Sequence, residues 1–448
     1  MMLAKRFLQL GSLVNYNVKC SSNLCGKGLI CGQYAIENRN TSNLRFKSTF
    51  SSPSSSSSST KPSKLKVFLV GGLTFCATYA TIEGFSGYFK KSKKVDEDHG
   101  KPSENHLEWD SYLRTVQNKP KGTIAGFVIP KETLPTIPVS REVDGPFKLN
   151  GTKLSLFQYQ TCPFCCKVRS FLDYYGLPYN VVEVDPVIRQ QLKFSKYRKV
   201  PILLVDEKTK DGKESSKYVQ LTDSSLIISI LSTYLMYNQG AENIQSIMDF
   251  YQNMDDSRGF ETDVINKYFL MIGEAWSPEK LKANENKLHE ERHWREWADN
   301  VLVHVISPNV YRTLDESFDA FNYFSEVGQW DKYFPTWERL ICIYIGAIGM
   351  YFVSKRLKRR HRLKEDVRSS LYDVGNQWIK AIGKNRKFMG GDKPNLADLA
   401  VYGALSSFEG CEAFRDLLKN VNIGPWFYSV KELCNAHAGS KFLTNANK

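Results

Sequence analysis

Acidic side chains are almost missing from the first 66 residues. This segment holds ten Lys and Arg residues against Glu37 alone, which accounts for nine of the fourteen net positive charges of the 448-residue chain. The remaining sequence is only mildly basic, so it lacks the basic surface of a nucleic-acid-binding protein, and we expect no such partner. An acid-poor leader rich in Arg, Lys and Ser is instead typical of an organelle transit segment.

The ten cysteines lack the short regular spacing of a small secreted domain, which excludes a disulfide scaffold and indicates a mostly reduced protein. Three of them cluster at Cys162, Cys165 and Cys166. No second Cys-x-x-Cys and no nearby pair of histidines accompanies them, so we expect no metal site. Buried structural thiols remain an alternative, but Cys-Pro-Phe-Cys between a strand and a helix favours reactive thiols.

Long hydrophobic runs are also scarce. Residues 67–82 carry no charge, and only Glu83 interrupts the apolar and small residues that continue to 89, with lysines on both sides. This pattern predicts a single membrane anchor at 67–89, with a buried helix as the alternative. The apolar stretch 340–353 is shorter and predicts a buried core helix. Residues 90–146 are polar and punctuated by proline, and read as a linker.

A folded unit is expected from Phe147 onward. Its periodicity predicts a domain over 147–236 with the order β-α-β-α-β-β-α. The predicted strands are 153–159, 179–185, 200–207 and 216–221. The predicted helices are 163–176, a second helix that ends at Lys199, and a third that begins after Asp223. Only helical patterns follow, which predicts an all-α domain over 237–448. Asn395 and Asp398 are spaced to form the capping box of one of its helices.

Cys162 is predicted at the start of the helix that begins with Pro163, a residue suited to the first helical position. Unpaired N–H groups and the helix dipole stabilise a thiolate there, so Cys162 should be the more acidic and reactive thiol. Cys165 lies one turn further and can form a disulfide with it, whereas Cys166 is directed toward packing.

Several segments resemble known families. Residues 159–179, 199–206 and 221–228 resemble a glutaredoxin-type thioredoxin fold, and residues 388–403 resemble the capped helix of the all-α domain of glutathione transferases. Together with residues 296–313 and 354–363, the chain from about Phe147 resembles the microsomal prostaglandin E synthase type 2 family.

The resemblance implies a thiol pair and a glutathione site. The thiol pair falls on Cys162 and Cys165, and Tyr159 and Phe164 line the pocket beside it. The residues that bind glutathione fall on Val200, cis-Pro201, Asp223 and Ser224. Asp223 and Ser224 are equally suited to ordinary helix capping.

The resemblance also implies haem as a second cofactor, at His304, Ser307, Arg356, Arg360 and Arg362. Taken alone, His304 would read as a core residue and the arginines as a solvated helix end. The implied activity is isomerisation of prostaglandin H2 to prostaglandin E2. A membrane-tethered thiol-disulfide oxidoreductase and a glutathione- and haem-binding protein with little turnover remain alternatives. A homodimer stays open.

The leader favours mitochondria over a Golgi-type membrane anchor with a released cytosolic fragment. Neither assignment involves a residue of the expected thiol site, because leader and anchor both precede the folded unit.

Overall fold

The computed structural model describes residues 127–149, 151–208, 213, 215–237, 243–251, 264, 266–272 and 276–444. The expected leader at 1–66 and the expected membrane anchor at 67–89 lie outside the described residues.

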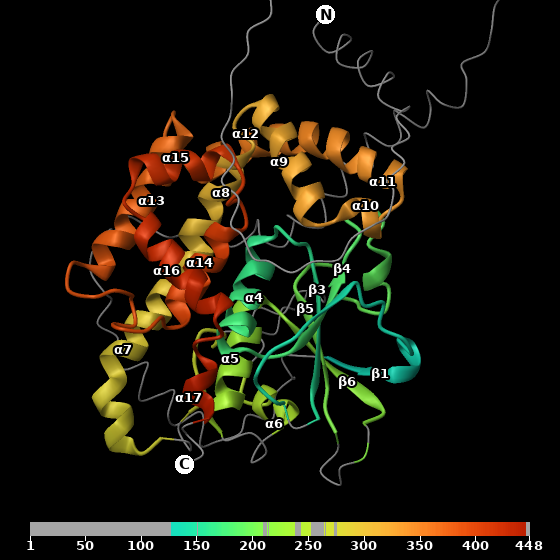
Figure 1. The fold of residues 1–448 in the computed structure, drawn as a ribbon, viewed down its shortest axis with the longest axis vertical. Helices are drawn as coiled ribbons and strands as arrows, with labels where there is room; N and C mark the ends of the chain where they lie inside the picture. Colours follow the sequence, from blue (N-terminus) through green and yellow to red (C-terminus); the bar gives the residue numbers. More distant parts are fainter. Residues whose placement is uncertain are drawn as a thin grey trace, which may run out of the picture. The chain divides into compact units, whose positions relative to one another are not determined.

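The first domain is built on a six-stranded sheet (Figure 1), in which the strand order is β1-β6-β5-β3-β4-β2. The strands are β1 (Phe127–Pro130), β2 (Arg141–Val143), β3 (Lys153–Gln158), β4 (Tyr179–Glu183), β5 (Ile202–Asp206) and β6 (Lys217–Thr222). Only β3 and β4 pair in parallel, and α4 (Pro163–Tyr175) supplies the crossover between them. The four strands predicted from the sequence are confirmed.

Strands β1 and β2 correct the expectation that residues 90–146 form a linker. β1 pairs with β6 and β2 pairs with β4, so they extend the sheet at its two edges. Ile129, Leu134 and Ile137 pack against a buried cluster of the sheet. Strands of three and four residues give too little alternation to recognise, and edge positions tolerate the neighbouring prolines.

The second predicted helix of this domain is also wrong. Before Lys199 the structure forms only a short 3-10 turn, η4 (Gln190–Leu192), which follows Arg189 in a left-handed conformation at φ 54°. The last helix forms as predicted: α5 (Ser224–Met236) begins after its N-cap Asp223. Gly176 ends α4 at φ 63°, as its position in the sequence indicated.

The second domain is helical, as predicted. Its elements are α6 (Ile244–Met248), α7 (Pro278–Trp297), the π-helical turn η5 (Ala298–Leu302), α8 (Val303–Val310), α9 (Leu314–Val327), α10 (Trp330–Tyr333), α11 (Thr336–Ile341), the π-helical turn η6 (Cys342–Gly346), α12 (Ala347–Arg360), α13 (Val367–Ile382), α14 (Leu396–Ser406), α15 (Glu412–Asn420), α16 (Gly424–Asn435) and α17 (Ser440–Thr444). The capping box of Asn395 and Asp398 at the start of α14 is confirmed.

The prediction of a buried core helix at 340–353 is wrong. α11, η6 and α12 join into one helix, Thr336–Arg360. Only 22% of the most apolar 18-residue stretch of this helix is buried. α8 and α9 cover it from one side, so a single stripe packs inward: Glu338, Cys342, Ala347, Ser354 and Leu357. Among the described residues, this is the helix long and apolar enough to cross a membrane.

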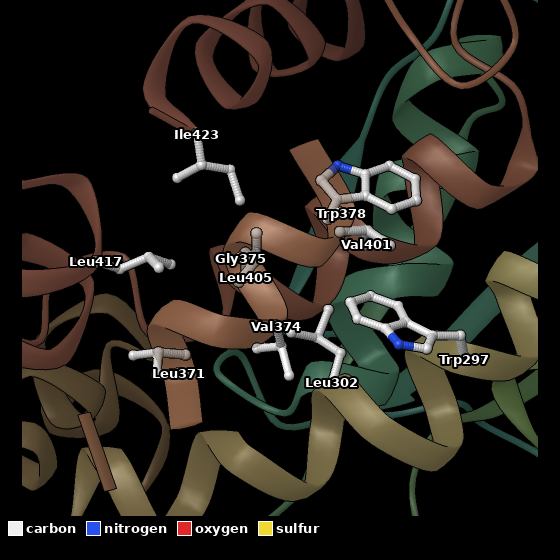
Figure 2. A pocket seen from close by; sticks show the side chains of 10 residues that line it. All are labelled: Trp297, Leu302, Leu371, Val374, Gly375, Trp378, Val401, Leu405, Leu417 and Ile423. Carbon is white, nitrogen blue, oxygen red and sulfur yellow. The ribbon is translucent and has the colours of Figure 1, made fainter. Parts of the chain in front are cut away.

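The core of the helical domain is apolar. Figure 2 shows Trp297 of α7 and Trp378 of α13 beside aliphatic side chains from α13 and α14. The two indole rings stack with centroids 6.2 Å apart. The crevice between these side chains has no space for a water molecule, so it is part of the close-packed core and not a ligand site.

Candidate functional site

The clustered thiols lie where α4 begins. Cys162 is the N-cap residue and half-buried, Pro163 occupies the first helical position, and Cys165 and Cys166 are buried. All six cysteines that the structure describes are free thiols. The three clustered sulfurs therefore differ in their access to solvent, and Cys162 is the one that a reactant can approach.

The three thiols differ in pKa because their surroundings differ. A hydrogen bond from the Cys165 thiol lowers the pKa of Cys162, against the opposing effect of burial, and backbone N–H groups of α4 and the charge of Arg169 lower it further. Burial raises the pKa of Cys165 and, separately, that of Cys166. A thiolate in this cluster therefore forms first at Cys162.

Arg169 is a site residue that sequence reasoning missed. Its guanidinium donates to Gln158 Oε1 at 2.6 Å, to Gln160 O at 2.7 Å and to Cys166 Sγ at 3.1 Å. This places a cation beside the thiols, where it favours their anionic form. The spacing of seven residues between Cys162 and Arg169 on one helix was the signal that could have found it.

Tyr159 and Phe164 border the thiols, and both are half-buried. Burial raises the pKa of Tyr159, with smaller effects from the charges of Arg189, Cys162 and Cys165. Its phenol therefore stays protonated and can donate a hydrogen bond near the thiols.

A buried ion pair fixes α4 against the helical domain. Lys167 of α4 binds Asp299 of η5, which also accepts from Ser225 Oγ at 2.6 Å and from Tyr268 Oη at 3.1 Å. The two residues of this ion pair are 132 positions apart in the sequence, so no local pattern predicts it. The cluster holds α4, α5 and η5 in one arrangement.

Gly403 allows α14 to lie close to α4. A Cβ at this position would stand 2.6 Å from the Cα of Lys167 and 2.8 Å from the carbonyl oxygen of Cys166. Both contacts involve backbone, which has little freedom to retreat. Any larger residue at 403 would therefore push the thiol-bearing helix from its position.

The expected glutathione residues lie at the start of strand β5 and at the start of helix α5. The Val200–Pro201 peptide bond is cis, as predicted, and stands just before β5. Asp223 caps α5 by accepting from the backbone N–H groups of Ser225 and Leu226. Its side chain is still 37% exposed. Ser224, the first residue of α5, is buried.

Lys267 is a second residue that the sequence did not reveal. Its Nζ atom lies 2.9 Å from Asp223 Oδ2, so an ammonium group adjoins the carboxylate at the start of α5. A zwitterionic ligand at this position would meet both charge signs within a few ångströms.

The expected haem residues lie on α8, on α12 and just after it. The His304 ring stacks on His361 with centroids 4.1 Å apart. Burial and the nearby Arg360 charge lower the pKa of His304. Burial, then His304 and Arg360, lower that of His361 to about 4. The remaining members are Ser307, half-buried on α8, and Arg356 and Arg362, both exposed.

Part of this chain is similar to known proteins. The family model of the glutathione S-transferase N-terminal domain matches residues 156–233, which include the thiols, the cis-proline and most of α5. A solved glutathione S-transferase-I bound with lactoylglutathione aligns with 64% of this chain and 99% of its own, at 14% identity and a TM-score of 0.34. The family model therefore shows that the thiol-bearing domain is glutathione transferase-like.

Two curated relatives are much more similar. Prostaglandin E synthase 2 from Mus musculus is 49% identical over 282 residues, covering 63% of this chain and 70% of the relative. Prostaglandin E synthase 2 from Danio rerio is 46% identical over 283 residues, covering 62% and 71%. The chain belongs to the prostaglandin E synthase 2 family of enzymes.

Proposed function

We propose that this chain isomerises prostaglandin H2 to prostaglandin E2 with thiol chemistry centred on Cys162. One observation supports this site above others: the accessible thiol at the start of α4 has a lowered pKa, while both neighbouring thiols have raised ones. A nucleophilic sulfur suits this substrate, because the weak bond of the substrate is the O–O bond of its endoperoxide.

The proposed reaction needs no net oxidation or reduction. A thiolate, from Cys162 or from glutathione bound beside it, attacks one endoperoxide oxygen and the O–O bond breaks. The other oxygen takes up a proton and becomes a hydroxyl. Loss of a proton from the ring carbon then forms the ketone, and the S–O bond breaks to release the thiolate. The Tyr159 hydroxyl, which stays protonated, is suited to donate to the oxygen that becomes the hydroxyl.

Glutathione fits the residues present, and we propose it as a cofactor. Asp223 offers a partly exposed carboxylate to the ammonium of the γ-glutamyl group, and Lys267 beside it offers a cation to the carboxylate. Val200 precedes the cis-proline and offers backbone groups to the peptide portion. These roles for Val200, Pro201, Asp223, Ser224 and Phe164 stay predictions.

The test is a product assay on prostaglandin H2, with and without glutathione, using matched Cys162→Ser and Cys434→Ser variants. Cys434 is a buried thiol of α16 outside the cluster, so its substitution controls for the loss of one sulfur. Loss of prostaglandin E2 formation only in Cys162→Ser supports the proposal. Product formed at the wild-type rate by Cys162→Ser without added glutathione contradicts it.

A thiol-disulfide oxidoreductase is the second candidate, because the Cys162 and Cys165 side chains are hydrogen-bonded and could exchange a disulfide. The Cys165→Ser variant separates the two activities. An isomerase should keep its rate without Cys165, whereas a dithiol mechanism loses the thiol that resolves the mixed disulfide.

Haem binding is a separate proposal, favoured by the pair of His304 and His361 beside Arg360. Burial keeps both imidazoles neutral, the form that binds iron, and Arg360 is suited to a propionate. Haem would supply iron chemistry, and His304 with the arginines would hold it. Titration with haemin should give an absorption band in the wild-type chain that is weaker in His304→Ala. Identical spectra for both proteins would contradict this assignment.

A further inference from the structure

The outer side of helix Thr336–Arg360 carries unusually exposed apolar residues. Trp337 is 53% exposed, Leu340 43% and Phe352 66%, and Phe352 and Trp337 are the two most exposed large hydrophobic residues of the described chain. A Cβ added at Gly349 would have no neighbour within 4 Å. We call Trp337, Leu340, Gly349 and Phe352 the apolar face.

These residues share one side because of the helix geometry. Twelve residues separate Leu340 from Phe352, and the π-helical turn η6 between them widens one turn. Twelve residues therefore make roughly three turns, which returns Phe352 to the side of Leu340. The inward stripe of Cys342, Ala347 and Ser354 lies on the opposite side, against α8 and α9.

The apolar face continues into a basic end. Residues 340–364 contain seven Lys and Arg residues and no Asp or Glu. Arg356 and Arg359 follow Phe352 at four and seven residues, so they share its side, and both are exposed, as is Arg362. Lys358 and Lys364 pair with Glu365 and Asp373. A helix with Trp, Leu and Phe on one side and cations beside them is typical of segments that lie in a membrane interface.

We propose that the apolar face rests on the surface of an anionic phospholipid bilayer, with the arginines at the headgroups. The helix lies on the bilayer and does not span it, because its other side is fixed to the protein. Ser354 Oγ donates to Tyr311 O at 2.8 Å and Lys355 Nζ to Arg312 O at 2.7 Å. A spanning helix would have to bury these polar groups, and Glu338 as well, in hydrocarbon.

Charge complementarity favours an anionic bilayer over a second copy of the chain as the partner of the apolar face. An anionic bilayer offers acyl chains to Trp337 and Phe352 and negative headgroups to the arginines. A copy related by a two-fold axis presents the same apolar and basic side chains in return. This contact is distinct from the expected anchor at 67–89 and does not depend on the proposed reaction.

The test uses the full chain with vesicles of phosphatidylcholine, with or without phosphatidylglycerol, that carry brominated acyl chains. Bromine quenches tryptophan only at contact, so the difference between wild type and Trp337→Phe isolates the signal of Trp337. Trp276→Phe is the matched control, since Trp276 precedes α7, whose first turns lie at the opposite end of the view from α12 (Figure 1).

We expect the Trp337 signal to be quenched at least twofold in vesicles with phosphatidylglycerol, and the Trp276 signal to stay unquenched. Phe352→Asp and Arg359→Glu should each restore most of the Trp337 signal, even where the anchor keeps the chain on the vesicles. Unquenched Trp337 in chains that float with the vesicles overturns the proposal. So does equal quenching without phosphatidylglycerol, or a dimer in light scattering that Phe352→Asp converts to a monomer.

Discussion

Replacing Lys167 with Met removes the cation of the ion pair that holds the thiol-bearing helix. The Lys167 side chain is 0% exposed and that of Asp299 7%, and Met is nearly as long but uncharged. Removing one partner of a buried pair costs about 3–5 kcal/mol. Asp299 keeps its hydrogen bonds from Ser225 and Tyr268, so we expect a value near the lower limit.

The loss should depend on pH. In the wild-type chain burial raises the pKa of Asp299, but the charge of Lys167 and the hydrogen bonds outweigh this and hold it below its usual value. That stabilisation is present above the unfolded-state pKa and is lost as pH falls through the folded one. Without Lys167, burial dominates and raises the pKa above the unfolded value, so the variant regains stability as pH falls. Its deficit should shrink as pH falls from about 7 toward the unfolded-state pKa of an aspartate, about 3.9.

Urea unfolding followed by circular dichroism measures both effects. The matched control is Lys167→Met with Asp299→Asn, which removes both charges of this pair and should lie within about 1 kcal/mol of the wild type. A single-variant deficit below about 1 kcal/mol that does not change with pH would refute this reasoning. A double variant no more stable than the single one would refute it equally.

Three further predictions concern the thiols, the start of the folded unit and the N-terminal leader. Brief alkylation at neutral pH followed by peptide mapping should label Cys162 before Cys165 and Cys166, and equal labelling would remove the argument for an activated thiol. A fragment starting at residue 121 should be soluble and active. One starting at 147 should aggregate, because it loses β1 and β2 and exposes both sheet edges; equal behaviour in sedimentation would contradict the corrected boundary. Residues 1–66 fused to a fluorescent reporter should carry it to mitochondria, and a diffuse cytosolic signal would defeat the proposed location.

The sequence by itself determined the elements that local chemistry specifies. Pro163 and Gly176 mark the two ends of α4, and Asp223 marks the start of α5. Asn395 and Asp398 mark the start of α14. These signals act within four or five residues, so they are readable without tertiary contacts. The thiol cluster was found in the same way, whereas the glutathione and haem residues were reached only through resemblance.

Tertiary structure alone decided the rest. β1 and β2 become strands because the edges of the sheet accept them. The pairs of Lys167 with Asp299 and of Lys267 with Asp223 join residues 132 and 44 positions apart. The apolar sequence of helix Thr336–Arg360 was plain, but its surface position was not, since hydrophobicity is the same for a core and for an outer face. Periodicity tells which residues share a side of a helix, and only the packing of α8 and α9 decides which side is covered.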